Sequence, residues 1–61
     1  MDHLPLNDVP MLVSSINFLL RDNEFDNLDQ ICDNFGVARS EMDAILKSGG
    51  YSYSEELNKV R

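Results

Sequence analysis

The sequence has few of the features that cross-link a small protein or attach it to a membrane. It holds a single cysteine, so no disulfide can form within the chain, and one thiol suits a reducing compartment. It lacks the run of roughly 20 apolar residues that spans a bilayer, and its start lacks the basic and apolar regions of a secretory signal. We therefore expect a cytoplasmic protein that binds no membrane.

Basic residues are also scarce. Five Lys and Arg residues stand against eleven Asp and Glu residues, which gives a formal net charge of −6 at pH 7. Because nucleic-acid binding depends heavily on neutralised phosphates, this balance disfavours nucleic acid as a partner. The chain is otherwise ordinary for a folded domain, with 43% hydrophobic residues. At 61 residues it is near the lower limit for unaided folding, where a partner often adds stability.

The hydrophobic pattern predicts a first helix over residues 9–21, preceded by a tail of residues 1–7. Asp8 is a plausible N-cap, and Pro10 lies in the first turn, where its missing N–H costs nothing. The apolar stripe of this helix comprises Val9, Leu12, Val13, Ile16, Leu19 and Leu20. Met11 and Phe18 lie on the opposite side of the helix, so they do not belong to the stripe.

Residues 28–47 match the apolar template of a helix-turn-helix. Read from Leu28, the matching apolar positions are Ile31, Phe35, Val37, Met42 and Ile45, with Cys32 in the small-residue slot and Gly36 at the turn. Asn27 or Asp26 can cap the helix over 28–35, with Gln30 completing a capping box from Asn27. We expect Gly36 to form a left-handed corner. A third helix over 39–48 follows, and Gly49 and Gly50 stop it.

The remaining residues predict a closing segment over the core. We expect Tyr51, Tyr53 and Leu57 to cover the core, and Ser54 to cap a last short turn; whether this segment is helical or extended stays open. The fold class is therefore all-α: a compact three-helix domain over residues 8–61 that contains a helix-turn-helix-like unit and ends in a short C-terminal closing segment.

No residues indicate catalysis, a metal or a cofactor. Asp22, Glu24 and Asp26 fit positions 1, 3 and 5 of a calcium-binding EF-hand loop, but Asn27 stands where that loop needs glycine. His3 has no second ligand at a useful spacing for zinc. Cys32 is expected to be a small buried apolar group. We predict a non-enzymatic protein with no cofactor and no small-molecule substrate.

Two kinds of partner remain. Met11 and Phe18 are either covered by the closing segment or form an exposed patch for a protein partner or a second copy of the chain. The alternative is a helix-turn-helix DNA-binding regulator that uses Arg39, Ser40 and Lys47. That alternative is disfavoured because residues 22–38 contain no base.

The chain resembles a family of short, uncharacterised bacterial proteins classed as a domain of unknown function. The resemblance rests on Leu4-Pro5, Met11-Leu12-Val13-Ser14, Asn17, Leu20-Arg21-Asp22, Leu28, Cys32, Gly50-Tyr51-Ser52-Tyr53 and Asn58. It implies a small stand-alone bacterial protein and brings no activity, ligand or catalytic residue. Family members tend to carry an acidic cap before the third helix; Ala38 stands there, so we expect a looser start to that helix.

Asn17 and Arg21 are polar positions that the resemblance marks and that packing alone does not require. We expect Asn17 to hold the terminal segment, and Arg21 to pair with a carboxylate or with the carbonyls that end its own helix. A binding role for this pair is the alternative. The function we predict is that of a small bacterial protein-interaction module, with self-association as one form of the interaction.

Overall fold

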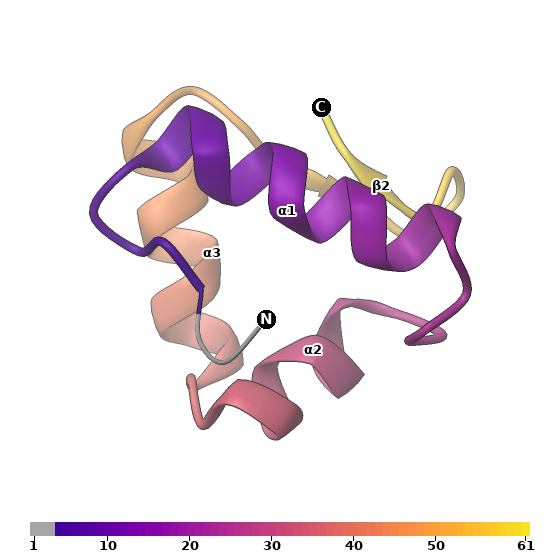
Figure 1. Ribbon diagram of the computed structural model, residues 1–61. Coiled ribbons are helices and arrows are strands. Elements are labelled where there is room, and N and C mark those ends of the chain that lie inside the picture. Colours follow the sequence, from indigo (N-terminus) through magenta and orange to yellow (C-terminus); the bar gives the residue numbers. More distant parts are fainter. Residues whose placement is uncertain (1–3) are drawn as a thin grey trace.

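The computed structural model describes residues 4–61, which form three helices and a two-stranded antiparallel sheet (Figure 1). The elements are α1 (Val9–Arg21), α2 (Leu28–Phe35), α3 (Arg39–Ser48), β1 (Tyr53–Ser54) and β2 (Lys59–Val60). The three helices agree with the sequence prediction. The sheet does not, so the all-α class is corrected to a mostly helical fold with a small sheet. Residues 1–3, including His3, lie outside the described part of the chain.

Helix α1 is the central element, because it contacts α2, α3 and β2 (Figure 1). The side chain of Asp8 accepts a hydrogen bond from the Met11 N–H at 3.1 Å, so the predicted N-cap is confirmed. Over residues 4–61, no helix has both the length and the apolar character needed to cross a bilayer.

Helix α2 begins with a side-chain cap and ends at a glycine. The Asn27 Oδ1 accepts the Gln30 N–H at 2.9 Å, while Gln30 Oε1 accepts the Asp26 N–H at 2.8 Å. The Gln30 side chain therefore bonds the N–H of Asp26, and not the N–H of Asn27 that the predicted capping box uses. Gly36 has φ 71°, the left-handed conformation that most side chains avoid, so the predicted corner is confirmed.

The N-terminus of α3 has no side-chain cap. Its N-cap residue, Ala38, offers no side-chain hydrogen bond to the first turn, in agreement with the expectation from its methyl side chain. The Gly49 and Gly50 N–H groups donate to Leu46 O and Lys47 O and end the helix as predicted.

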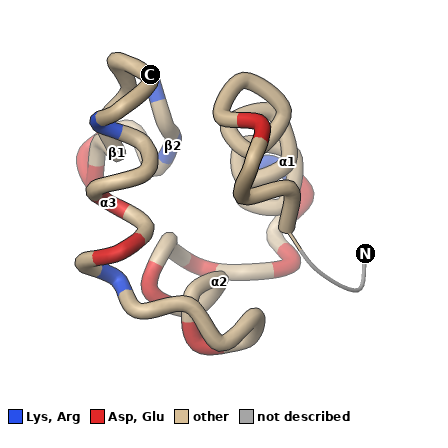
Figure 2. The backbone as a smooth tube through the Cα atoms, turned by 90° about the vertical axis from the view of Figure 1, so that its left-hand side faces the viewer, with Lys and Arg blue, Asp and Glu red and all other residues tan. Residues whose placement is uncertain are grey.

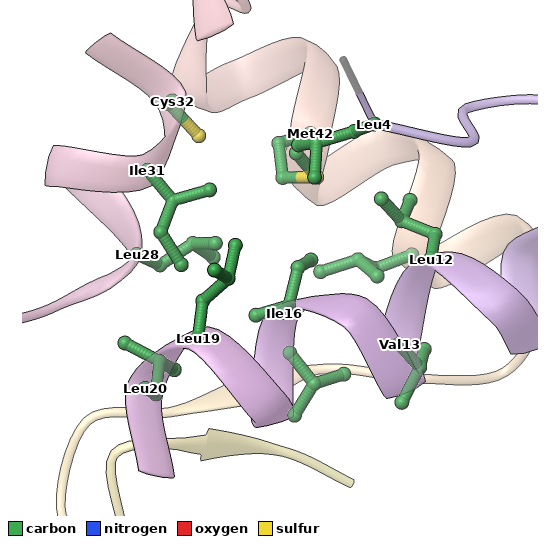
Figure 3. Packing of buried hydrophobic residues seen from close by; sticks show 12 residues of the cluster. Leu4, Leu12, Val13, Ile16, Leu19, Leu20, Leu28, Ile31, Cys32 and Met42 are labelled. Carbon is green, nitrogen blue, oxygen red and sulfur yellow. The ribbon is translucent and has the colours of Figure 1, made fainter. Parts of the chain in front are cut away.

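The core lies between the three helices, and Val60 of β2 and Leu4 add to it (Figure 3). Its buried residues are Leu4, Leu12, Val13, Ile16, Leu19, Leu20, Leu28, Ile31, Cys32, Met42, Leu46 and Val60. Leu4 thus extends the core into the segment that the sequence predicts as a tail. The prediction for Leu57 is wrong: its side chain is exposed, and Val60 is the hairpin residue that enters the core.

The closing segment is a hairpin, which settles the choice between helical and extended chain. Tyr53 pairs with Val60 and Ser54 with Lys59, and two backbone hydrogen bonds between Ser52 and Arg61 continue the ladder. Ser54 Oγ accepts the Leu57 N–H at 3.2 Å, so it caps a turn as predicted, but the chain reverses there. This reversal turns Leu57 outward.

Candidate functional site

Three large hydrophobic side chains are exposed among residues 4–61. The exposed fractions are 56% for Met11, 48% for Phe18 and 49% for Leu57. Met11, Ser14, Phe18 and Arg21 follow one another on α1 at spacings of three and four residues, so they share one face of the helix. The closing segment therefore does not cover the two residues that the sequence predicts as a partner surface.

Phe18 and Leu57 line one groove, which we call the α1–hairpin groove. It lies between the C-terminal half of α1 and the hairpin loop and has a volume of about 680 Å³. Its lining includes Ser14, Asn17, Phe18, Arg21, Leu57 and Lys59. An exposed aromatic and an exposed aliphatic side chain in one concave surface are typical of a binding site rather than of an ordinary solvated face.

The charge of this groove differs from the charge of the molecule. Arg21 and Lys59 line it, and of the described residues no Asp or Glu does. Acidic positions are frequent along α2 (Figure 2), and Glu55 and Glu56 directly follow β1, whereas Lys59 and Arg61 lie in and next to β2. The Arg21 guanidinium lies over the Phe18 ring, 5.7 Å from its centroid, and Arg21 Nε lies 3.9 Å from Asp22 Oδ1. Cation and ring thus form one rim of the groove.

Asn17 has the structural role that the sequence predicts. Its Nδ2 donates to Val60 O at 2.9 Å, and its Oδ1 accepts the Val60 N–H at 2.7 Å. The amide therefore satisfies both backbone groups of Val60 as a neighbouring strand would, and it fastens the hairpin to α1. The groove beside it has a fixed wall on the hairpin side.

Arg21 makes one of the two contacts that the sequence predicts, an ion pair with a carboxylate. Its side chain is 76% exposed, and its ion pair with Asp22 is at the surface. The carbonyls of Phe18, Leu19 and Leu20 at the end of α1 accept backbone N–H groups of residues 22–24. Its one further contact is the cation–π contact with Phe18.

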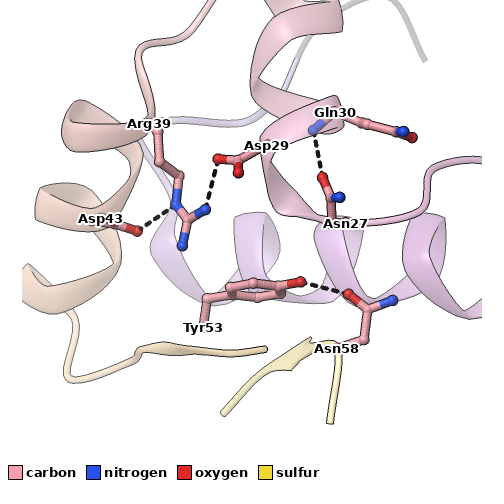
Figure 4. Close-up of polar contacts among 7 residues, drawn as sticks. All are labelled: Asn27, Asp29, Gln30, Arg39, Asp43, Tyr53 and Asn58. Carbon is pink, nitrogen blue, oxygen red and sulfur yellow. Dashed lines mark hydrogen bonds and ion pairs between the residues drawn. The ribbon is translucent and has the colours of Figure 1, made fainter. Parts of the chain in front are cut away.

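Arg39, the first of the candidate DNA contacts, joins three elements (Figure 4). Its Nη1 lies 2.7 Å from Asp29 Oδ1 of α2, its Nε lies 3.0 Å from Asp43 Oδ1 of α3, and its guanidinium stacks 5.1 Å from the centroid of the Tyr53 ring. These hydrogen bonds, chiefly the one to Asp29, raise the pKa of Arg39 above its ordinary value. The other two candidates, Ser40 and Lys47, are exposed on α3.

A second polar cluster holds the hairpin loop. The Tyr53 hydroxyl donates to Asn58 Oδ1 at 2.6 Å, and Asn58 Nδ2 donates to Asp26 O at 3.0 Å (Figure 4). Asn58 has φ 52°, the left-handed conformation that asparagine tolerates better than most residues. These contacts fix the loop that carries Leu57, so this wall of the groove is preformed.

Cys32 lies within the core, with 2% of its surface exposed. Burial raises the pKa of its thiol above the ordinary value; nearby Arg39 acts in the opposite direction but does not reverse the shift. The residue is thus a small apolar group, as the sequence predicts. Within residues 4–61, no three His, Cys, Asp or Glu side chains are grouped so that they could hold a metal ion.

The sequence prediction found the α1 side of the groove and missed the hairpin side. Phe18 was identifiable because it falls outside the apolar stripe of a helix with clear bounds; Met11, identified in the same way, does not line the groove. Leu57 and Lys59 were missed because their directions depend on where a two-residue strand pairs. Asn58, a residue type that often adopts positive φ in turns, was the available signal for a chain reversal there.

Comparison with known proteins gives one family. A family model described as "Domain of unknown function (DUF4250)" matches residues 6–60, which is nearly the whole of this chain. No curated protein matches the chain, and no solved structure does.

Proposed function

The chain belongs to the DUF4250 family, and we propose that it is a non-enzymatic protein-interaction module that binds its partner through the face formed by Met11, Phe18 and Leu57. The proposal includes a cytoplasmic location, because the one cysteine is a buried free thiol and needs no oxidising compartment. A bacterial origin remains what the sequence resemblance implies.

The observation that carries the proposal is the exposure of Phe18 beside Leu57. Among residues 4–61, every buried side-chain nitrogen or oxygen atom has a hydrogen-bond partner. Phe18 and Leu57, by contrast, are apolar side chains that remain about half exposed, and both line one groove. Aromatic side chains in pockets are the residues that contribute most to protein–protein binding.

Site-specific photocrosslinking in the organism that encodes the chain tests this proposal. A photoreactive amino acid replaces Met11 or Phe18 in the full chain, and a matched variant carries it at Asp33, which is exposed on α2. We expect discrete protein adducts from positions 11 and 18 and none from position 33. Equal adduct patterns at all three positions, or none at positions 11 and 18, would reject the surface.

Self-association through the same face is one form of the proposal. It would produce crosslinked adducts of twice the 7.0 kDa chain mass. Sedimentation over a range of concentrations, with wild type and Phe18→Ser compared, measures it directly. A concentration-dependent dimer that Phe18→Ser abolishes supports self-association, whereas a strictly monomeric wild type with unchanged mutant behaviour removes it.

The second candidate function is a helix-turn-helix DNA-binding regulator. The left-handed Gly36 between two short helices favours it, as do Ser40 and Lys47 on the exposed side of α3. The engagement of Arg39 by two carboxylates weighs against it, because phosphates would have to displace both. A gel shift with random duplex DNA at low salt decides the point, since even nonspecific binding is visible there.

A further inference from the structure

The α1–hairpin groove combines an apolar floor with cationic rims, and we propose that it binds an acidic segment of a partner protein that inserts a large apolar side chain between Phe18 and Leu57. This inference rests on the proposed function and adds the chemical class of the partner. It concerns the groove alone and makes no use of the exposed face of α3.

The charge argument depends on where the few bases lie. Two of the five basic residues of the chain line the groove, and no acid within residues 4–61 lines it, although the chain has eleven acids. At physiological ionic strength, charges beyond about 8 Å are largely screened. The charges at the groove therefore matter more than the net charge of −6: Arg21 and Lys59 in its lining, with Asp22 beside Arg21 and with Glu55 and Glu56 directly before Leu57.

Both cations are accessible to a partner. The Arg21 side chain is 76% exposed, and its pair with Asp22 at 3.9 Å is a surface pair, which contributes little. Lys59 is exposed and has no ion pair with any residue of the 4–61 range. By contrast, Arg39 is already paired with two carboxylates. A guanidinium also matches a carboxylate in shape, because two of its N–H groups can bind both oxygens.

The apolar part of the groove lies directly beside these cations. Phe18 and Leu57 are each about half exposed, at 48% and 49%, and Leu20 contributes to the lining between them. The cation–π contact at 5.7 Å keeps the Arg21 guanidinium over the Phe18 ring. A carboxylate and an apolar side chain on neighbouring turns of one partner segment would thus both find complementary groups.

The hairpin restricts how the partner binds. The Asn17 amide occupies the N–H and the carbonyl of Val60, so a partner strand cannot extend the sheet at that position. Recognition must come from side chains of a helix or loop.

Selection of random displayed peptides on the immobilised full-length chain tests the inference. We expect enriched peptides that combine Asp or Glu with Leu, Phe or another large apolar residue. The double substitution R21Q/K59Q should weaken their binding about fivefold, as two exposed ion pairs would. The matched control Lys47→Gln removes an exposed base outside the groove and should leave binding unchanged. Phe18→Ser should weaken it at least about tenfold.

The outcomes separate the class of partner from the surface itself. Peptides that depend on Phe18 but carry no acidic bias, or that bind R21Q/K59Q as well as wild type, would overturn the acidic class and leave the protein-binding surface standing. Peptides that ignore Phe18→Ser, or a selection that enriches nothing, would count against the surface as well. Duplex DNA that competes with the peptides for the groove would replace the protein partner with a nucleic acid.

Discussion

At the scale of single residues, two polar neighbours on α1 have opposite roles. Asn17 makes two hydrogen bonds to Val60, while the Arg21 side chain is 76% exposed and contacts its partners at the surface. Asn17 therefore belongs to the architecture, and Arg21 to the proposed binding surface. The two residues are four positions apart on one helix, so substituting each by alanine forms a matched comparison.

We predict that Asn17→Ala destabilises the fold and that Arg21→Ala does not. The first substitution leaves the Val60 N–H and carbonyl unpaired in a half-buried site, at a cost of about 2 kcal/mol. In a domain of this size that lowers Tm by about 10 °C, which thermal unfolding followed by circular dichroism measures. A drop in Tm for Arg21→Ala comparable to that for Asn17→Ala would return Arg21 to a structural role.

Gly36 gives a second residue-scale prediction. Its φ of 71° strains any residue with a Cβ, although a Cβ there would meet no atom within 4 Å. Gly36→Ala should therefore cost about 1 kcal/mol through the backbone alone. Gly36→Asn should cost less, because asparagine tolerates this conformation. Urea unfolding of both variants measures the difference; equal stability of Gly36→Ala and wild type would contradict the left-handed corner.

The buried thiol predicts a pH dependence. Because the folded pKa of Cys32 is raised, the neutral thiol is the form that the fold favours. The stability that the neutral Cys32 thiol contributes is fully present below its ordinary pKa of 9.0. It is lost as the pH rises past that value, because the thiol then ionises in the unfolded chain, which stabilises the unfolded state. The urea midpoint of wild type should fall relative to that of Cys32→Ala above this pH. Parallel midpoints across the range would argue that the thiol is solvated.

At the scale of elements, the contact between α3 and α1 depends on a glycine. A Cβ at Gly49 would lie 2.5 Å from Val9 Cγ1 and 3.1 Å from Val9 Cβ, and valine has little rotamer freedom to move away. Gly49→Ala should cost about 1–2 kcal/mol for this reason. In a Val9→Ala background the same substitution should cost less, because the 2.5 Å contact with Cγ1 is gone while the 3.1 Å contact with Cβ remains. Additive costs in a double-mutant cycle would show that Val9 is not the obstacle.

The elements also show how far sequence reasoning reaches. The helices follow from local signals: the caps at Asp8 and Asn27, the apolar spacing and the glycines at their ends, which all act within a few residues. The hairpin has a weaker local signal, Asn58 in its turn, because strands of two residues show no alternation. It forms through contacts with distant residues, such as the Asn17–Val60 pair, which are 43 positions apart. The same difference applies to the candidate site: Phe18 on α1 was predicted from the sequence, and Leu57 and Lys59 on the hairpin were not.

At the scale of the whole molecule, a thin core and an exposed apolar groove have one common consequence. A chain of 61 residues has little stability in reserve, and a partner that covers Phe18 and Leu57 would add burial that the chain cannot supply itself. In the proposed function, the net charge of −6 favours solubility, and the cations at the groove select the partner.

The central claim is that the α1–hairpin groove is the working surface of the protein. Nuclear magnetic resonance of the ¹⁵N-labelled chain, added to an unlabelled lysate of the organism that encodes it, tests this claim residue by residue. The account predicts selective broadening of the amide signals of Phe18, Arg21, Leu57 and Lys59, and its loss in Phe18→Ser. Selective broadening along the exposed face of α3, around Ser40 and Lys47, would contradict it.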